Sequence, residues 1–223
     1  MENIHEYILS NFEESDLSPA KSYIFSKYHL RFELGDTLKN GTKKRVKQSV
    51  LRAVTIFEEF FNSDDEIWIL INYMKHRDRS IKYFWNPTNG YLENQFTNFH
   101  LINKISAEET IEEFDEALNE ETNLMEMTDF TCTHIQNFFN LKVSDINYKN
   151  IIEGIANLEM GFDPSIGEYV CFINPRNDVA FHMYDDRGCL LFASDHETLK
   201  PTYDKYNQWL VDYHRATFDD MFS

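Results

Sequence analysis

The sequence predicts an α+β protein: a mainly antiparallel sheet with helices packed on one face and a C-terminal helix. Aromatic residues make up 15% of the 223 residues and apolar residues 42%, which is enough for a buried core. Short alternating runs between turn residues predict antiparallel strands. Apolar residues three and four positions apart predict amphipathic helices. We expect a single domain over 1–223, or two parts, 1–105 and 106–223, that share one core.

In the first half of the chain, helices and strands are predicted to alternate. Residues 2–14 form a helix, since Ile4, Ile8 and Phe12 recur at every fourth position. Leu30, Phe32 and Leu34 would share one face of a strand. The pattern of apolar residues further predicts a helix over 42–62, a buried strand over 67–73, a strand-like alternation at Ile81, Tyr83 and Trp85, and a short strand around 99–102.

The second half is predicted to be richer in strands. Ser106-x-x-Glu109 resembles a capping box, and Ile111, Phe114 and Leu118 follow at helical spacing, so we expect a short acidic helix over 106–118. The remaining expected elements are strand-like runs over 124–130 and 131–139, a helix over 147–160 that ends at Gly161, a meander of strands over 169–173, 179–184 and 190–193, and a final helix over 200–220 with Tyr203, Tyr206, Trp209, Leu210 and Tyr213 turned inward.

The net charge is −17, from 38 acidic and 21 basic residues. Such a field repels phosphate backbones and anionic bilayers, so we expect neither direct nucleic-acid binding nor membrane association. It favours a basic protein partner. The simpler interpretation, that the charge only maintains solubility, stays open.

The cysteines and the N-terminus indicate a cytoplasmic protein. Cys132, Cys171 and Cys189 are odd in number and lack CxxC spacing, which predicts reduced thiols. The first residues resemble no signal peptide, and no apolar run reaches the roughly 20 residues of a membrane span.

The most distinctive tract is His182-Met183-Tyr184-Asp185-Asp186-Arg187-Gly188. His182 and Tyr184 would share a strand face, and Gly188 would supply the positive φ of a tight turn. His182 with Asp185 or Asp186 could form a general-base pair, a weak metal site, or, with Arg187 and Tyr184, a recognition surface. The structural alternative, which we favour, is a hairpin turn in which the Asp side chains accept turn N–H groups and Arg187 pairs with a carboxylate.

Two further groups of residues are candidates for a site. Lys43, Lys44, Arg45 and Lys47 form a basic cluster that could bind an anion or sense a nucleotide, although pairing with neighbouring carboxylates is the simpler interpretation. Cys132 and His134 lie two apart on a predicted strand, so a Cys–His nucleophile pair is conceivable, but a core thiol beside a surface histidine is favoured. Because the sequence has no nucleotide-binding glycine motif, no GxSxG and no HExxH, it predicts no cofactor and no metal site.

The C-terminal third carries four distinctive motifs, which are Ile152-x-Gly154-Ile155-Ala156-Asn157, Val170-x-Phe172-Ile173-Asn174, His182 to Gly188, and Leu199-Lys200-Pro201-x-Tyr203-x-Lys205-Tyr206-Asn207-x-Trp209-Leu210. With these motifs the chain resembles a bacterial family of unknown function that occurs mainly in Gram-positive bacteria. The resemblance has consequences for the expected setting of the protein. It implies a stand-alone cytoplasmic bacterial protein and brings no activity, cofactor or catalytic residue. Acidic proteins of this kind often serve as immunity or antitoxin-like partners, by analogy.

Taken together, these observations predict a non-enzymatic acidic binding protein that neutralises a basic partner such as a toxin. The alternative is a hydrolase-type enzyme with its site at the hairpin of His182 to Gly188. The sequence leaves the oligomeric state open.

Overall fold

Seven strands of the computed structural model form one antiparallel sheet in the order β1-β7-β6-β5-β2-β4-β3. The structure describes residues 4–18, 21–76, 90–118 and 125–223, so the expected alternation at 81–85 lies outside the described residues. The strands are β1 (His29–Glu33), β2 (Glu66–His76), β3 (His100–Leu118), β4 (Met125–Lys142), β5 (Tyr169–Asn174), β6 (Val179–Asp185) and β7 (Gly188–Ala193). The predicted fold class is confirmed.

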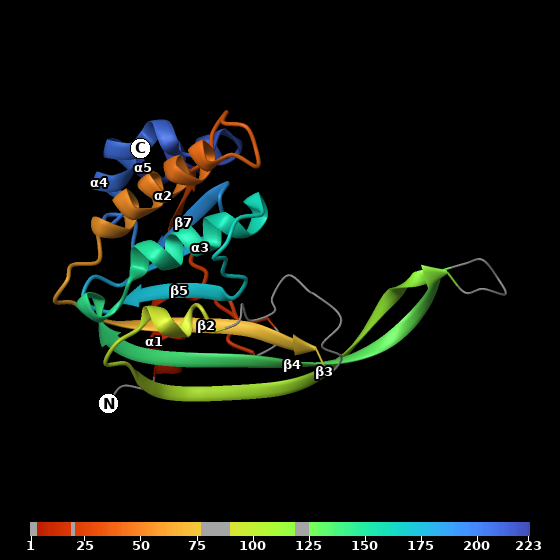
Figure 1. The fold of residues 1–223 in the computed structure, drawn as a ribbon. Coiled ribbons are helices and arrows are strands. Elements are labelled where there is room, and N and C mark those ends of the chain that lie inside the picture. The colour runs from red at the N-terminus through yellow and green to blue at the C-terminus, as the bar shows by residue number, and fades with distance from the viewer. Residues whose placement is uncertain (1–3, 19–20, 77–89, 119–124) are drawn as a thin grey trace.

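Helices α2 (Lys43–Glu58) and α3 (Tyr148–Met160) lie side by side over one face of the sheet (Figure 1). Phe57 of α2 packs against Phe172 and Phe181 of the sheet with ring centroids 5.1 and 5.6 Å apart. As predicted, α3 ends at Gly161, whose φ of 71° is the left-handed conformation that stops a helix.

The opposite face of the sheet is covered by the N-terminal segment. Helix α1 (Ile4–Asn11) and the chain after it bury Ile8, Phe12 and Ile24 against the sheet. Tyr7 donates a hydrogen bond of 2.5 Å to Asp178, in the turn between β5 and β6. The sheet is therefore covered on both faces, and α1 adds a layer to the single helical face expected from the sequence.

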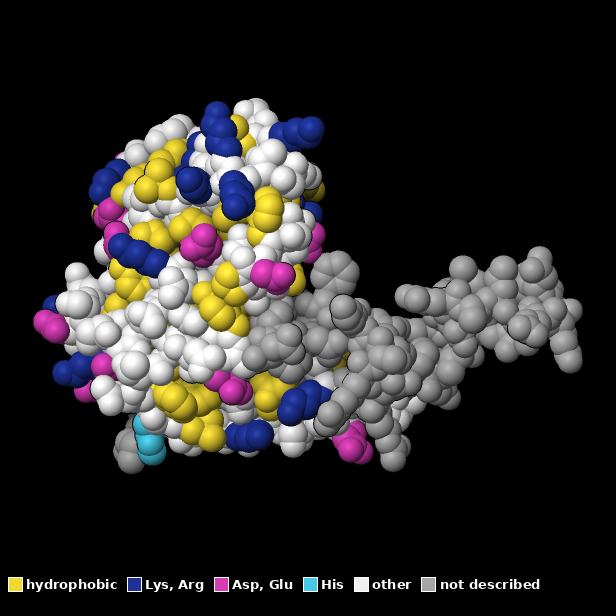
Figure 2. Space-filling model, viewed as in Figure 1, with side chains coloured by type: hydrophobic (Ala, Val, Ile, Leu, Met, Phe, Trp, Pro, Cys, Tyr) yellow, Lys and Arg dark blue, Asp and Glu magenta, His cyan; other side chains and the backbone are white. Residues whose placement is uncertain are grey.

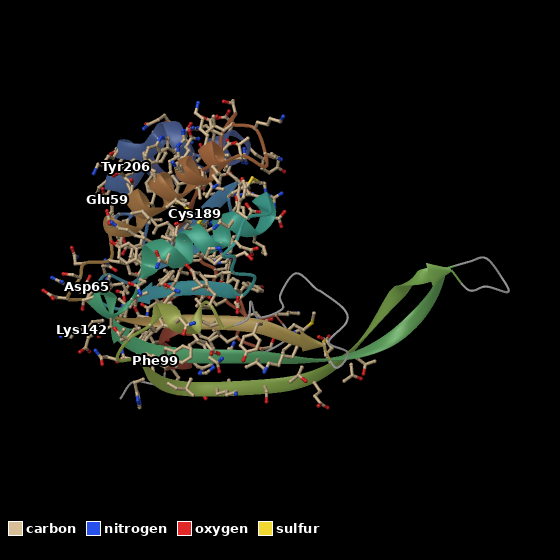
Figure 3. The ribbon with its side chains drawn as sticks, viewed as in Figure 1. Glu59, Asp65, Phe99, Lys142, Cys189 and Tyr206 are labelled. Atoms are coloured by element: carbon tan, nitrogen blue, oxygen red, sulfur yellow. The ribbon has the colours of Figure 1, made fainter. Side chains whose placement is uncertain are left out.

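The predicted helix over 200–220 is broken. It consists of α4 (Lys200–Tyr206), 3-10 turns at Asn207–Trp209 and Asp212–His214, and α5 (Arg215–Phe222). Leu210 is extended, and Val211 N–H donates to Arg31 O at 3.1 Å, so this segment adds to the edge of β1. Glu59 accepts from Tyr206 and Lys205, at 2.5 and 2.6 Å, and anchors α4 (Figure 3). Tyr213, expected to be buried, is 91% exposed.

The predicted helix over 106–118 is wrong, because these residues belong to β3. Ser106 pairs with Ile135, and the pairing continues to Leu118 opposite Met125. The capping-box pattern is a local signal, whereas β4 offers a long run of unpaired backbone groups, and this tertiary pairing outweighs the helical preference. Two short 3-10 turns flank the hairpin of β3 and β4 in the sequence, at Glu93–Gln95 and Val143–Asp145. Beside them, Phe96 and Ile146 form an isolated antiparallel bridge.

Gly188 is required for space and not for its conformation. It lacks the positive φ that the sequence suggested, which among the described glycines occurs at Gly41, Gly90 and Gly161. A Cβ atom at Gly188 would stand 1.9 Å from Tyr184 Oη and 2.8 Å from the backbone oxygen of Phe32. The absent side chain therefore makes room for the Tyr184 ring and the neighbouring strand.

We predict that Gly188→Ala lowers the free energy of unfolding by about 1–3 kcal/mol, since overpacking against fixed backbone forces a shift. Gly154→Ala is the matched control: the nearest atoms to its Cβ would be side-chain atoms of Ile166, at 2.8 Å, and not backbone, and alanine favours the helix. Urea unfolding of both variants measures the difference. Equal losses would contradict the explanation.

Candidate functional site

The turn between β6 and β7 holds the acidic pair of the 182–188 tract. Asp185 accepts from the backbone N–H of Arg187 at 2.7 Å and from its Nε at 2.7 Å. The Asp185 side chain is buried, whereas the Arg187 side chain is 68% exposed. These contacts are those of the hairpin turn that the sequence favoured.

Asp186 points into the protein and forms a buried ion pair with Arg45 of α2. The guanidinium also donates to the carbonyls of Leu38, at 2.7 Å, and Asp36, at 3.2 Å. Ser49 donates to Asp186 O at 2.6 Å. The pair therefore joins the first turn of α2 to the β6–β7 turn and to the loop after β1, and Gly35 leaves the space that the guanidinium fills.

The other members of the basic cluster are separated from Arg45. Lys43, Lys44 and Lys47 are exposed on α2, and none of them has an ion pair with a residue that the structure describes. Basic side chains gather on the part of the surface that α2 and the C-terminal helices form (Figure 2). A nucleotide sensor would need the side chains of the basic cluster to converge on a pocket. Among the described residues they do not.

His182 lies on the opposite sheet face from the Arg45–Asp186 pair. Its Nδ1 is 2.9 Å from Val170 O, and its ring lies 4.1 Å from that of Tyr169. Burial lowers the pKa of His182 to about 4, with partial opposition from the Val170 carbonyl and the charge of Asp185. Neither Asp185 nor Asp186 is hydrogen-bonded to the ring among the described atoms, so the structure does not bring together the general-base pair that the sequence left as a possibility.

A pocket of about 340 Å³ lies between this sheet face and the N-terminal segment. Its lining includes Ser22 and Tyr23 from that segment, and Asn72, His134 and His182 from the sheet. Asn72 Oδ1 is buried and accepts no hydrogen bond within the part of the chain that the structure describes. The pocket offers polar groups to a small ligand, but within the described lining no nucleophile is paired with a base.

Tyr184, the remaining candidate of the tract, lines a broader hollow of about 650 Å³. Its hydroxyl accepts from Arg31 Nε at 3.1 Å, and the Arg31 guanidinium lies 5.2 Å from the ring centroid. His29, Arg187 and His214 also line this hollow, and its described lining contains no Asp or Glu.

A cluster that the sequence did not reveal forms between β3 and β4. Glu109 pairs with Cys132 across the strands, and His134 lies two residues further along β4. His134 Nε2 is 2.9 Å from Glu109 Oε2 and 3.5 Å from Cys132 Sγ. The Cys-x-His spacing was a visible signal, but Glu109 was assigned to a helix, which hid its place beside them.

Cys132, Cys171 and Cys189 are buried. Burial raises the pKa of Cys171 to about 12 and raises that of Cys189 further. These two thiols are therefore protonated at neutral pH and pack as small apolar side chains, as the sequence predicted for Cys171.

The fold and these contacts define an α+β protein with a covered sheet, a projecting hairpin and no assembled catalytic triad among the described residues.

A family model described as "Domain of unknown function (DUF3885)" matches residues 4–214, and the chain belongs to this family. The expectation of a bacterial family of unknown function is confirmed. The chain is 25% identical to the "Uncharacterized protein YnaE" of Bacillus subtilis (strain 168), with 95% of this chain and 98% of that protein covered. No solved structure matches. None of the described helices is both long and apolar enough to span a bilayer.

We predict that Arg45→Met destabilises the protein by about 3–5 kcal/mol, because the Asp186 carboxylate is left buried without its partner. The double variant Arg45→Met, Asp186→Leu removes both charges and should recover most of this loss. Lys43→Met, an exposed change on the same helix, should stay within about 0.5 kcal/mol of the parent protein. Urea unfolding at neutral pH measures all three, and a double variant as unstable as Arg45→Met would contradict the prediction.

Stability should also fall in mildly acidic solution because of His182. An ordinary histidine has a pKa near 6.5, so between this value and about 4 the unfolded chain binds the proton more strongly than the folded chain. The contribution is complete above pH 6.5 and is lost as the pH falls towards 4. Between pH 7 and 5 we expect about 2 kcal/mol from this group.

His182→Gln should reduce this pH dependence, whereas His100→Gln, at an exposed position of β3, should leave it unchanged. The measurement is urea unfolding at the two pH values. The difference between variant and parent isolates His182 from His29, whose pKa burial also lowers. An unchanged pH dependence in His182→Gln would exclude this role.

Proposed function

We propose that this protein is a non-enzymatic binding protein that engages a basic protein partner through the hairpin of β3 and β4. The observation that carries the proposal is the coincidence of an extended, projecting backbone with the most acidic stretch of the sequence. In its sharpest form the protein is an immunity or antitoxin-like factor that neutralises a basic toxin.

The first support is the projection of the hairpin from the body (Figure 1). β2 pairs with β4 from Lys142 to Cys132, where β2 reaches His76. Beyond this point β4 pairs with β3 alone among the described residues, from Thr131 opposite Thr110 to Met125 opposite Leu118. We call residues 110–118 and 125–131 the hairpin arm.

The second support is the distribution of charge along the sequence. Between Lys104 and Lys142 there is no Lys or Arg, so this stretch contributes −10 of the net charge of −17. Its ten acidic residues are Glu108, Glu109, Glu112, Glu113, Asp115, Glu116, Glu120, Glu121, Glu126 and Asp129. Acidic surfaces attract basic partners and accelerate their association.

The third support is the free edge of the sheet. β3 ends the strand order, so its outer backbone groups have no strand partner among the described elements. In the hairpin arm, the edge of β4 that faces away from β3 likewise has no strand partner among the described elements. A partner can add a strand to such an edge, and main-chain hydrogen bonds then contribute affinity while charge contributes specificity.

A last support comes from the tract His182 to Gly188, on which the enzymatic alternative depends. Asp185 and Asp186 are engaged by Arg187 and Arg45, and His182 by a backbone carbonyl. These polar groups stabilise the fold, which leaves binding as the function that the geometry supports best.

The test compares the full chain with an arm-shortened variant as baits in the source bacterium. In this variant Thr110 and Thr131, which are partners in register, are joined by Asn-Gly, a sequence that favours two-residue hairpin turns. We expect a basic protein, identified by mass spectrometry, to be retained by the full chain, to dissociate as salt rises, and to be absent with the variant.

The control for folding is the thermal unfolding of the variant, which should stay cooperative because the described residues that it lacks, 111–118 and 125–130, pair between β3 and β4 and not with β2. A second bait, Lys43→Met, keeps the arm and should retain the same partner. Capture of the same proteins by the full chain and the arm-shortened variant would refute a role of the arm. Recovery of background proteins alone at low salt would refute the binding function.

A further inference from the structure

The root of the hairpin arm gathers three different metal-binding side chains. Glu109, Cys132 and His134 each offer one ligand atom, and these atoms lie within 4.8 Å of one another. Cys132 is 1% exposed, and the side chains of His134 and Glu109 are 12% and 48% exposed. The cluster thus runs from a buried thiol to a carboxylate in contact with solvent.

Two of the three spacings among these atoms are close to the edges of a tetrahedron around zinc. Zinc bonds of about 2.3 Å to sulfur and about 2.0 Å to nitrogen or oxygen place sulfur about 3.5 Å from nitrogen, and nitrogen about 3.3 Å from oxygen. The measured Sγ–Nε2 distance is 3.5 Å and the Nε2–Oε2 distance is 2.9 Å. The third spacing, between Sγ and Oε2, is at most 4.8 Å, and the half-exposed Glu109 carboxylate is the ligand with room to adjust.

The arrangement suits a cation better than a catalytic Cys–His pair. A histidine that activates a thiol uses one ring nitrogen for the thiol and the other for the orienting carboxylate. Here Cys132 Sγ and Glu109 Oε2 both approach Nε2 of His134. One nitrogen carries either a proton or a lone pair and cannot satisfy both roles, whereas a cation accepts lone pairs from all three atoms at once.

We propose that Glu109, Cys132 and His134 bind a zinc-class divalent cation at the root of the hairpin arm. Thiolate and imidazole ligands select zinc-class ions over magnesium and calcium, which prefer oxygen ligands. On binding, the Cys132 thiol releases its proton to solvent and the sulfur becomes a thiolate ligand. Three protein ligands leave one tetrahedral position for water or another ligand, and His134 also lines the 340 Å³ pocket.

This inference does not rest on the proposed binding function and is tested with the metal alone. Untagged full-length protein, reduced and stripped with a chelator, is titrated with Zn²⁺ by calorimetry and with Co²⁺ by absorption. We expect one ion per chain, tetrahedral Co²⁺ bands and a thiolate-to-cobalt charge-transfer band.

Three variants and two matched controls locate the site. Cys132→Ser should abolish the charge-transfer band. His134→Ala and Glu109→Gln should each weaken Zn²⁺ binding by at least about tenfold, because loss even of a residue that only supports a metal ligand lowers metal affinity by about that factor. Glu108→Gln and His100→Ala change exposed residues of the same strand, β3, that lie outside the cluster, and both should bind like the parent protein.

Glu109→Gln keeps the test decisive if the buried Cys132 variant fails to fold, because Glu109 is half-exposed. Absence of a charge-transfer band at one equivalent of Co²⁺ in the parent protein would overturn the proposal. So would Zn²⁺ affinities of Glu109→Gln and His134→Ala equal to those of the Glu108→Gln and His100→Ala controls.

Discussion

The buried ion pair between Arg45 and Asp186 is the contact on which the arrangement of the molecule depends. It connects residues 141 positions apart, and the same guanidinium holds two carbonyls of the loop that follows β1. Without it, the first turn of α2 would lose its attachment to the β6–β7 turn, and a carboxylate that is 1% exposed would remain unpaired. The ion pair thus fixes the helical layer on the sheet, although burial of its two charges carries a desolvation cost.

The sequence predicted those elements whose signal is local and agrees with their burial. The apolar stripe of α2, the glycine that ends α3 and the three strands of the meander were all expected and found. It failed at 106–118, where the helical spacing of Ile111, Phe114 and Leu118 was outweighed by pairing with a strand that follows later in the chain. The break of the last helix at Leu210 has a similar origin, since the adjoining Val211 bonds to the edge of β1.

The sequence predicted individual residues of the candidate site better than it predicted which of them lie together. The sequence identified Asp185, Asp186 and Arg187 as a polar turn, and the favoured structural interpretation matches the contacts found. It could not show that Arg45 turns inward while Lys43 stays exposed, because a helix periodicity does not reveal a partner on a distant turn. Likewise, the approach of Glu109 to Cys132 depends on strand register, which short-range patterns leave undetermined.

The two edges of the sheet are covered to different extents. The C-terminal segment bonds to β1 through Val211, so that edge is partly covered, whereas β3 at the other end has no strand partner among the described elements. The exposed Lys43, Lys44 and Lys47 lie on α2, whereas the stretch between Lys104 and Lys142, which has ten acidic residues and no Lys or Arg, lies in the hairpin. The acidic stretch and the open backbone edge therefore coincide in the hairpin.

The contact between Tyr7 and Asp178 has a consequence for synthesis on the ribosome. The two residues are 171 positions apart, and the sheet face that buries Ile8 and Phe12 includes Tyr169 and Ala180. At about 5–20 residues per second, the N-terminal segment emerges roughly ten to thirty seconds before its docking surface exists. During that time its apolar residues are accessible to chaperones and to other nascent chains, and the N-terminus is among the last parts of the chain to reach its folded position.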